Sequence, residues 1–450
     1  MRLIALAAAV SALSLATACG AQDGTGPAGP PAPGGALETR AGNGPPQPVP
    51  PRPPPPAGGP RAGRPPAGPP AAGGPLETRA ANAPDQRPAF EGQTRAPGVT
   101  TERALTHTVV ASGLVEPWGL ALLPDGRWLV TERPGRLRIV AADGAVGEPV
   151  AGLPAVDARG QGGLLDVVVG PTFAQDRLIY WSYAEPRDGG NATSVARGRL
   201  SDDGTRVEAV QVIFRAMPTF DGTMHYGSSL AFGRDRKLFV TLGERSVAEM
   251  RPQAQDLGSH MGKTVRIEAD GSVPADNPFV GREGALPEIW SLGHRNVQGI
   301  AVAPDGDVWT IEHGTRGGDE LNLDRPGLNY GWPVIAYGIE YRGGAINEGI
   351  TAREGMEQPV YYWDPVIAPG GMTFYDGAMF PEWRGNLLVA ALKEKHVARL
   401  VLDGDRVVGE ERLLTDLGER VRDVAVGPDG AVWAVTDEEN GKLVRLAAAD

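Results

Sequence analysis

The sequence predicts an all-β fold, a six-bladed β-propeller, on the strength of two observations. The first is a phrase that repeats from about residue 110, in which a short apolar strand, a turn of the Pro-Asp-Gly kind and a second apolar strand follow one another. Asp-Gly between alternating apolar runs is a strong hairpin signal, and evenly spaced four-stranded units are typical of propellers. The second is the scarcity of helical patterning, because Gly and Pro recur too often for long helices.

Six copies of the phrase define the predicted blades in chain order. The six copies share roughly 340 residues, so each blade has fewer than about 60 residues, which is typical of loop-rich propellers. The copies are residues 118–132, 164–183, 229–244, 299–314, 371–392 and 421–437.

The strand THTVVASGL, residues 106–114, precedes the first copy. We expect it to complete the last blade and close the ring, since closure hides strand edges that would otherwise pair with other chains. The propeller domain is therefore predicted to span residues 105–450. Residues 101–450 carry 35 Lys and Arg against 50 Asp and Glu. This acidic balance argues against a nucleic-acid partner.

The first 19 residues are predicted to be a signal peptide. Arg2 precedes the apolar run LIALAAAVSALSLATA, which is short for a membrane span and typical of the apolar region of an export signal. The only cysteine, Cys19, follows Leu-Ala-Thr-Ala, which resembles a bacterial lipoprotein cleavage box, although ordinary cleavage is an alternative. We therefore expect an exported protein, either periplasmic or anchored to the cell envelope by a lipid on Cys19.

Residues 20–104 are predicted to be a disordered linker rich in Pro, Gly and Ala. Of the 42 prolines, 22 lie between residues 20 and 100, and such a segment cannot bury enough apolar surface to offset its ordering entropy. GGALETRA, residues 34–41, recurs as GGPLETRA, residues 73–80. Neither copy has apolar periodicity, so we interpret the repeat as duplicated linker.

Several cationic residues lie in loops beside the repeat strands, where the loops of a propeller converge at one end of the central channel. Four such cations at one site would repel one another unless an anionic ligand neutralised them. Solvated surface charges are an equal alternative. The four are Arg295 in GHRN, Lys393 in ALKEK, and Arg420 and Arg422 in ERVRD.

Two further features are candidates for chemistry. His225 in MHYGSSLAF precedes a repeat strand and is a candidate general base, because imidazole titrates near neutral pH, although a lone His is more often structural. Asp319 and Glu320, with nearby carbonyls and Tyr330, offer the hard oxygen ligands that calcium prefers. A solvated loop without an ion is the alternative.

From about residue 105 the chain resembles the soluble PQQ-dependent aldose sugar dehydrogenases, relatives of bacterial soluble glucose dehydrogenase. The resemblance implies a six-bladed propeller that binds pyrroloquinoline quinone (PQQ) and calcium. It also implies oxidation of aldose sugars at the anomeric carbon to lactones, with a quinone or cytochrome as external electron acceptor. The motifs that carry it are GQGGLLDV (160–167), MHYGSSLAF, MGKTVRIEADGSVPADNPF (261–279), GHRNVQG (293–299), HGTRGGDELN (313–322), GLNYGWP (327–333), ALKEK and ERVRDV.

The resemblance also implies which residues hold the cofactors. The four cations would clamp the three carboxylates of PQQ, with Gln161 and Asn296 as neutral hydrogen-bonding partners. The carbonyl oxygens of Gly314 and Thr315 would bind the calcium at PQQ. Glu320 and Tyr330 match a second calcium site.

The catalytic roles follow from the same resemblance. His225 matches the family's base, which takes the proton of the anomeric hydroxyl while a hydride passes to PQQ. Arg422 would stabilise charge on the reduced cofactor. Glucose-specific relatives carry an Asp that orients the catalytic His, and this chain has Glu244 there. Thr315 stands where the family often has Pro, which makes the loop less rigid.

Two other functions remain as alternatives. A calcium-dependent sugar lactonase would need several carboxylates in the central channel, and the loops here look cationic. A non-catalytic binding propeller would be expected to lose His225 or the four cations, and all are present. Fold alone does not choose among these functions, because propellers host unrelated activities.

Overall fold

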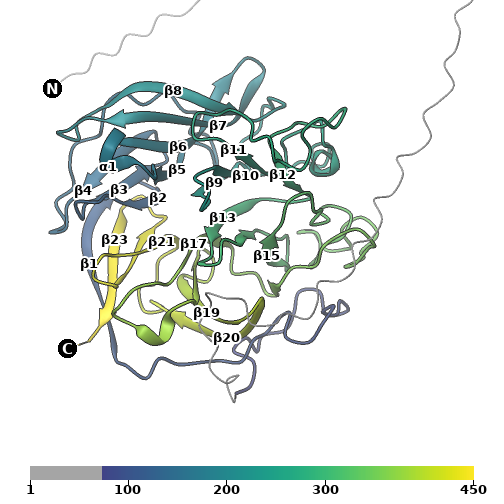
Figure 1. The fold of residues 1–450 in the computed structure, drawn as a ribbon. Coiled ribbons are helices and arrows are strands. Elements are labelled where there is room, and N and C mark those ends of the chain that lie inside the picture. Colours follow the sequence, from purple (N-terminus) through teal and green to yellow (C-terminus); the bar gives the residue numbers. More distant parts are fainter. Residues whose placement is uncertain (1–72, 450) are drawn as a thin grey trace, which may run out of the picture. The chain divides into compact units, whose positions relative to one another are not determined.

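The computed structural model describes residues 73–449, and most of these form a ring of six antiparallel β-sheets (Figure 1). Each sheet is one blade, with four strands in five of the blades and three strands in the other. The predicted six-bladed β-propeller is therefore confirmed.

The blades follow one another along the chain, and each begins with its inner strand. Blade 1 holds β2 (Pro117–Leu122), β3 (Trp128–Glu132) and β4 (Arg136–Val140); blade 2 holds β5 (Leu164–Val169), β6 (Leu178–Arg187), β7 (Gly190–Leu200) and β8 (Val207–Arg215); blade 3 holds β9 (Gly227–Phe232), β10 (Leu238–Leu242), β11 (Lys263–Ile267) and β12 (Ile289–Leu292). Blade 4 holds β13 (Val297–Val302), β14 (Val308–Glu312), β15 (Asp319–Asp324) and β16 (Tyr361–Trp363); blade 5 holds β17 (Pro369–Phe374), β18 (Leu387–Ala391), β19 (His396–Asp403) and β20 (Arg406–Leu413); blade 6 holds β21 (Val421–Val426), β22 (Val432–Thr436), β23 (Gly441–Ala448) and β1 (Leu105–Leu114).

Helices are short in the described part of the chain, as the Gly and Pro content predicts. They are α1 (Phe173–Asp176), η1 (Arg251–Gln255) and η2 (Pro381–Trp383). None of the helices within residues 73–449 has the length and apolar character needed to cross a membrane.

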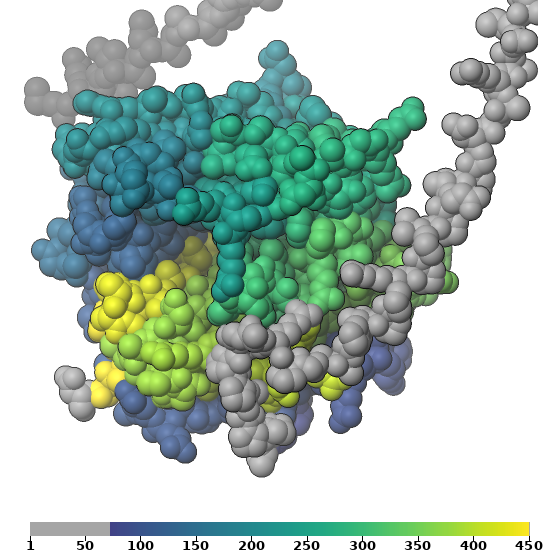
Figure 2. Space-filling view, viewed as in Figure 1, coloured from purple at the N-terminus to yellow at the C-terminus, as the bar shows by residue number. Residues whose placement is uncertain are grey.

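The ring closes through β1, the strand that precedes the first repeat. β1 pairs with β23 from Leu105 opposite Ala448 to Leu114 opposite Gly441, so the two ends of the propeller share blade 6. Figure 2 shows the yellow C-terminal residues against blue residues from near the start of the ring. The predicted closure by residues 106–114 is confirmed.

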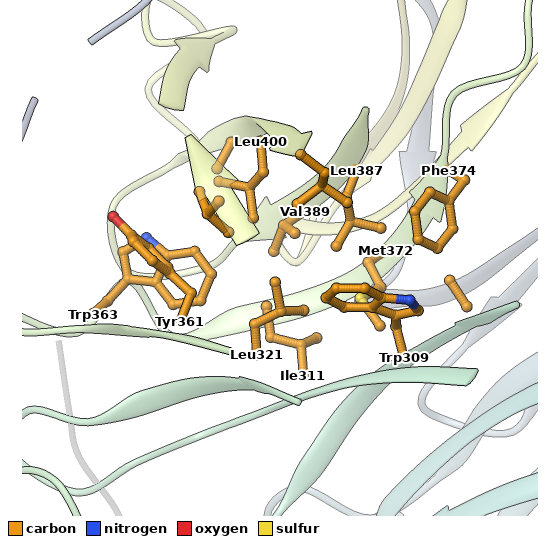
Figure 3. Packing of buried hydrophobic residues seen from close by; sticks show 14 of the residues in the cluster. Trp309, Ile311, Leu321, Tyr361, Trp363, Met372, Phe374, Leu387, Val389 and Leu400 are labelled. Carbon is orange, nitrogen blue, oxygen red and sulfur yellow. The ribbon is translucent and has the colours of Figure 1, made fainter. Parts of the chain in front are cut away.

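The core lies between neighbouring blades, where the two faces of each sheet are covered. Figure 3 shows Trp309 and Ile311 of blade 4 packed against Met372, Phe374 and other residues of blade 5. A sheet that is covered on both faces needs apolar side chains on both faces. This explains why strands such as β14 and β18 are buried along their whole length.

The six repeated phrases correspond to the two inner strands of each blade. Each inner strand pairs with the next strand through a hairpin, as β13 does with β14 around the Asp305-Gly306 turn. The inner strands contact one another around the channel in the order β2, β5, β9, β13, β17 and β21.

Residues 73–104, which we call the strap, differ from the prediction of a linker. They have almost no regular structure, yet they pack on blades 4 and 5: Gln93 is fully buried, and Gly98 forms a β-bridge with Glu410. Ala96 lies in the core between the two blades. The prediction was wrong for this segment because the strap is held by hydrogen bonds of side-chain amides and backbone groups, which leave no apolar periodicity in the sequence.

Other predictions for the N-terminal region lie outside the described residues. These are the signal peptide over residues 1–19, the lipid on Cys19, the linker up to residue 72 and the first copy of the LETRA repeat.

Candidate functional site

A pocket lies at the end of the channel where the six inner strands begin. In every blade the pairing register between the inner strand and its neighbour shifts near this end. A β-bulge of this kind places an extra residue in one strand and re-aims its side chain. Trp118, Leu165, Gln298 and Arg422 all lie within these shifts and all line the pocket.

The pocket has a volume of about 380 Å³, within the range of small-molecule sites. Trp118, Leu165 and Tyr226 supply apolar surface. The prediction of cationic channel loops is only partly right, because carboxylates that precede β2 or follow β22 line the same pocket. The charged lining residues are Arg133, Arg420, Arg422, Glu116, Asp437, Glu438 and Glu439.

His225 lies immediately before β9, beside this pocket, and is held by two contacts. Its backbone N–H donates to Gln161 Oε1 at 2.8 Å, and its Nδ1 lies 3.3 Å from Glu244 Oε1. Glu244 follows β10 and is fully buried, and its other oxygen accepts the backbone N–H of Ser246. The structure thus brings together three residues that the sequence analysis selected from three separate loops.

The electrostatics around His225 favour a neutral imidazole. Its pKa is lowered to about 4, first by burial and then by the positive charge of Arg295, while Glu244 acts in the opposite direction. Burial acts to raise the pKa of Glu244, but the contacts with His225 and Arg295 outweigh it and the pKa is lowered. An ionised Glu244 only accepts hydrogen bonds, so Nδ1 carries the proton and Nε2 keeps the lone pair.

The backbone at His225 is strained. Its φ of 50° lies in the left-handed region that favours glycine, and such conformations persist only where the surroundings impose them, often at functional sites. Arg245 supplies part of that constraint: it donates to the carbonyls of Gly222 at 2.7 Å and Met224 at 3.1 Å. Its guanidinium also lies 4.0 Å from the centre of the Tyr226 ring.

Arg295 and Asn296 lie between β12 and β13, and both are buried. Arg295 Nη1 donates to the carbonyl of His313 at 3.1 Å and to that of Gly314. Asn296 Oδ1 accepts from Gln298 Nε2 at 3.3 Å. The backbone oxygens of residues 313 and 314 therefore already stabilise a positive charge.

The other three predicted cations lie near carboxylates. Arg420 and Arg422 share Asp437, at 2.9 and 3.7 Å. The Lys393 side chain is half exposed, and its ammonium lies 3.9 Å from Glu394. The argument that these cations require an anionic ligand is therefore weakened, because protein carboxylates already offset much of their charge.

Asp319 stabilises the loop that carries Gly314 and Thr315 by accepting backbone hydrogen bonds. Its Oδ1 accepts the Gly314 N–H at 2.8 Å, and its Oδ2 accepts the Ala368 N–H at 2.7 Å. Burial raises the pKa of Asp319 to about 6. The Thr315 hydroxyl is buried and has no hydrogen-bond partner among the described residues.

Glu320 and Tyr330 line a cavity of about 10 Å³, close to the room that one water-sized species needs. Burial raises the pKa of Glu320 well above its ordinary value, and the carboxylate of Glu312 adds to this. The Tyr330 hydroxyl donates to the carbonyl of Leu323 and accepts the Arg325 N–H at 2.9 Å. The Tyr330 hydroxyl is therefore engaged with Leu323 and Arg325, neither of which lines this cavity.

His294 and His313 make contacts that agree with a structural role. His294 Nδ1 lies 2.9 Å from Glu312 Oε1, and its ring stacks on Tyr330 with centroids 4.7 Å apart. His313 Nε2 lies 2.7 Å from the carbonyl oxygen of Pro369. The pKa of His313 is lowered to about 3, first by burial.

Within residues 73–449, no three His, Cys, Asp or Glu side chains gather as a metal-binding group.

Sequence reasoning missed Arg133, Gln298 and Asp437, which all line the pocket. Arg133 follows β3 and pairs with Glu116. Gln298 Oε1 accepts from Arg422 Nη1 at 2.9 Å. An alignment of the six repeats would have found Gln298, because it occupies the second position of its inner strand, as Arg422 does.

Comparison with known proteins adds to this geometry. A family model described as Glucose / Sorbosone dehydrogenase matches residues 114–445. The aldose sugar dehydrogenase YliI of Escherichia coli (strain K12) is 46% identical over 345 residues, which cover 75% of this chain and 92% of that protein.

Solved structures share the fold over the same region. A crystal structure of a glucose dehydrogenase is 50% identical, with a TM-score of 0.74, and the match covers 76% of this chain and 100% of that one. The PQQ-bound form of the aldose sugar dehydrogenase from Streptomyces coelicolor is 28% identical, with a TM-score of 0.63, and covers 77% and 100%. The chain therefore belongs to the glucose / sorbosone dehydrogenase family, a family of sugar dehydrogenases with the PQQ-binding propeller fold.

Proposed function

We propose that this protein is a PQQ- and calcium-dependent dehydrogenase that oxidises aldose sugars at the anomeric carbon to lactones. The observation that carries the proposal is the neutral His225, paired with Glu244 and held by Gln161 beside a pocket that also contains Arg420 and Arg422. A base, hydrogen-bond donors and fixed positive charge are what an alcohol oxidation with an anionic cofactor needs.

The size of the pocket and its arginines support PQQ as the ligand. Its volume of about 380 Å³ suits a small flat molecule, and Trp118 and Leu165 offer apolar surface to a ring. Arg422 is buried and lies partly outside the reach of its carboxylate partner, with 3.7 Å to Asp437. A cofactor carboxylate would give this guanidinium a shorter ion pair than the one with Asp437.

The carbonyl groups of Gly314 and Thr315 support a calcium site in the loop from His313 to Thr315, because carbonyl oxygens are ligands that calcium accepts. The Gly314 carbonyl accepts a hydrogen bond from the Arg295 guanidinium, so it already stabilises a positive charge. Glu320 provides a carboxylate for a second ion, since a cation in its cavity would offset the repulsion from Glu312.

Bound PQQ, polarised by calcium, would supply the acceptor for the hydride of the anomeric carbon. His225 Nε2 accepts the proton of the anomeric hydroxyl, and the Nδ1–H bond to Glu244 stabilises the imidazolium that forms. Gln161 keeps the strained backbone of His225 in place. Arg422 provides fixed positive charge near the reaction, and Gln298 orients it.

We also propose that the protein is exported, that a lipid on Cys19 anchors it to the cell envelope, and that a quinone or cytochrome takes up the electrons. The apolar N-terminal run and the sequence before Cys19 support the anchor. Fractionation of cells tests it: a Cys19→Ser variant that stays in the membrane fraction would overturn the lipid anchor.

The central test is reconstitution of the purified protein with calcium and PQQ. We expect aldose-dependent reduction of an artificial dye, and loss of roughly 10²- to 10⁴-fold in turnover for His225→Ala, which removes the base. The variant should still bind PQQ, as followed by absorbance titration. Dye reduction without PQQ, or undiminished turnover in His225→Ala, would contradict the proposal.

A further inference from the structure

We propose that the strap, residues 73–104, positions the loop on which calcium would bind beside PQQ. The strap lies before the region that the family model matches, residues 114–445. Its backbone is fixed on blades 4 and 5 at several points; for example, the Ala96 N–H donates to the Tyr361 hydroxyl at 2.9 Å. The inference rests on the function proposed above and identifies side chains outside the pocket that support it.

The first contact joins Gln86 to the segment that covers the loop from Gly314 to Gly318. Gln86 Oε1 accepts the Gly338 N–H at 2.6 Å, and Gln86 Nε2 donates to the Gly338 carbonyl at 3.0 Å. One side-chain amide therefore satisfies both backbone groups of Gly338, as a neighbouring β-strand would.

Gly338 and Ile339 in turn contact the loop from Gly314 to Gly318. Ile339 and Arg316 exchange two backbone hydrogen bonds, at 3.0 and 3.1 Å. Gly338 also lies so close to Gly317 that a Cβ on Gly338 would overlap the Gly317 carbonyl oxygen. A change at Gln86 would therefore displace residues 338–339, and these residues contact the loop directly.

The second contact reaches the same loop through Asn82 and Asp364. Asp364 Oδ1 accepts from the Asn82 N–H at 2.8 Å and from its Nδ2 at 2.9 Å. Asn82 Oδ1 accepts from Arg316 Nε at 3.2 Å. The Asp364 carboxylate lies against Gly317, since a Cβ there would be 2.9 Å from it.

The third contact reaches the Glu320 cavity. Gln93 is fully buried, and the Tyr337 hydroxyl shares its proton between Gln93 Oε1 at 3.0 Å and Gln358 Oε1 at 2.8 Å. Tyr337 lines the same cavity as Glu320, and its carbonyl lies against Gly318. The amide side chains of Asn82, Gln86 and Gln93 therefore fix the loop from Gly314 to Gly318 and the Glu320 cavity.

The loop needs such support because of its composition. Gly317, Gly318 and Gly338 all have φ between 78° and 94°, and glycine loses more conformational entropy on ordering than other residues. A loop that is already ordered binds an ion or cofactor without this cost. The strap thus acts on affinity through the loop and touches neither the ion nor the cofactor.

The test compares Gln86→Ala with a matched control in the full chain. Thr101→Ala is the control, because Thr101 is in the strap but its hydroxyl contacts Glu411 and Trp383, away from the loop. Calcium binding is measured by calorimetry and PQQ binding by absorbance titration. We expect Gln86→Ala to weaken both by about 10- to 100-fold, as removal of an outer-shell partner does, and Thr101→Ala to leave both within about twofold.

Hydrogen exchange of the cofactor-free protein gives a readout that needs no ligand. Residues 314–318 and 336–339 should exchange about tenfold faster or more in Gln86→Ala and at the wild-type rate in Thr101→Ala. Gln86→Glu keeps the acceptor for the Gly338 N–H but places a carboxylate oxygen against the Gly338 carbonyl, so it should also speed exchange, and it replaces Gln86→Ala if the latter does not fold.

Equal exchange in Gln86→Ala and wild type would overturn the role of the strap, as would equal loss in the Thr101→Ala control. Failure of the wild-type protein to bind PQQ or calcium would overturn the proposed function instead. In that case the exchange experiment alone decides whether the strap orders the loop.

Discussion

At the scale of single residues, neighbours from three other parts of the chain determine the charge and the backbone conformation of His225. Burial and Arg295 lower its pKa to about 4, and Glu244 opposes both. The imidazole is therefore neutral, and available as a base, near neutral pH. Its strained backbone is fixed by Gln161 and by the carbonyl contacts of Arg245.

Glu244→Gln is expected to lower turnover by roughly 10- to 100-fold, because loss of the carboxylate charge makes His225 a weaker base. The sign of the pH effect follows from the same charge: Glu244 raises the pKa of His225, so its removal shifts the acid limb of the pH–rate profile to lower pH. KM and PQQ binding should stay close to wild type. Steady-state kinetics between acid and neutral pH check this.

Glu244→Asp keeps the charge at a greater distance from the imidazole and serves as the control. It should recover part of the turnover and leave the acid limb near its original position. An unchanged profile in Glu244→Gln would show that Glu244 does not act through His225.

At the scale of elements, the inner strands approach one another so closely that several positions admit only glycine. A Cβ on Gly119 would lie 2.8 Å from Asp166 Oδ1, and one on Gly299 would lie 2.7 Å from the Gly370 carbonyl oxygen. A Cβ on Gly370 would overlap the carbonyl oxygen of Arg422. The narrow channel and the β-bulges at its pocket end thus depend on small residues in the inner strands.

Gly370→Ala is expected to destabilise the protein by about 1–3 kcal/mol or more, because the overlapping atom belongs to the backbone of β21 and overpacking of this kind is costly. The shift of β21 should also displace Arg422 and weaken PQQ binding. Chemical denaturation and absorbance titration measure the two effects. Gly74→Ala is the control, since a Cβ there meets nothing within 4 Å, and equal stability of the two variants would contradict the argument.

At the scale of the whole molecule, the ring depends on one strand from the start of the propeller. Leu114 of β1 is fully buried in a cluster with Trp128 and Trp433, which joins blade 6 to blade 1. The closure therefore couples the first and last blades through both hydrogen bonds and apolar packing.

Leu114→Ala is expected to cost about 2–5 kcal/mol, the usual range for a buried Leu that leaves a cavity. Thermal and denaturant unfolding measure the change. Val109 lies in the same strand but is 44% exposed, so Val109→Ala should change stability by no more than about 0.5 kcal/mol. Similar losses in the two variants would show that β1 does not close the ring through its buried face.

Much of the site could be predicted from the sequence, but not its contacts. The motifs around His225 and Arg422 selected residues that the structure places beside or in one pocket, and Arg295 lines the cavity of Glu320. The carboxylate partner Asp437 was missed, because nothing in the local sequence shows which loop of blade 6 faces which cation. The hydroxyl of Tyr330 also points to partners in its own loop, a detail that a motif match does not contain.

The sequence by itself determined the repeat, the number of blades and the strand that closes the ring, because apolar alternation and turn residues report local structure directly. Only the tertiary structure decided how the charges pair, which residues the β-bulges turn into the pocket, and that the strap folds against blades 4 and 5. Those features depend on contacts between segments far apart in the chain. The strap binds through single amides such as Gln86 and Gln93, and such contacts have no period for a sequence pattern to show.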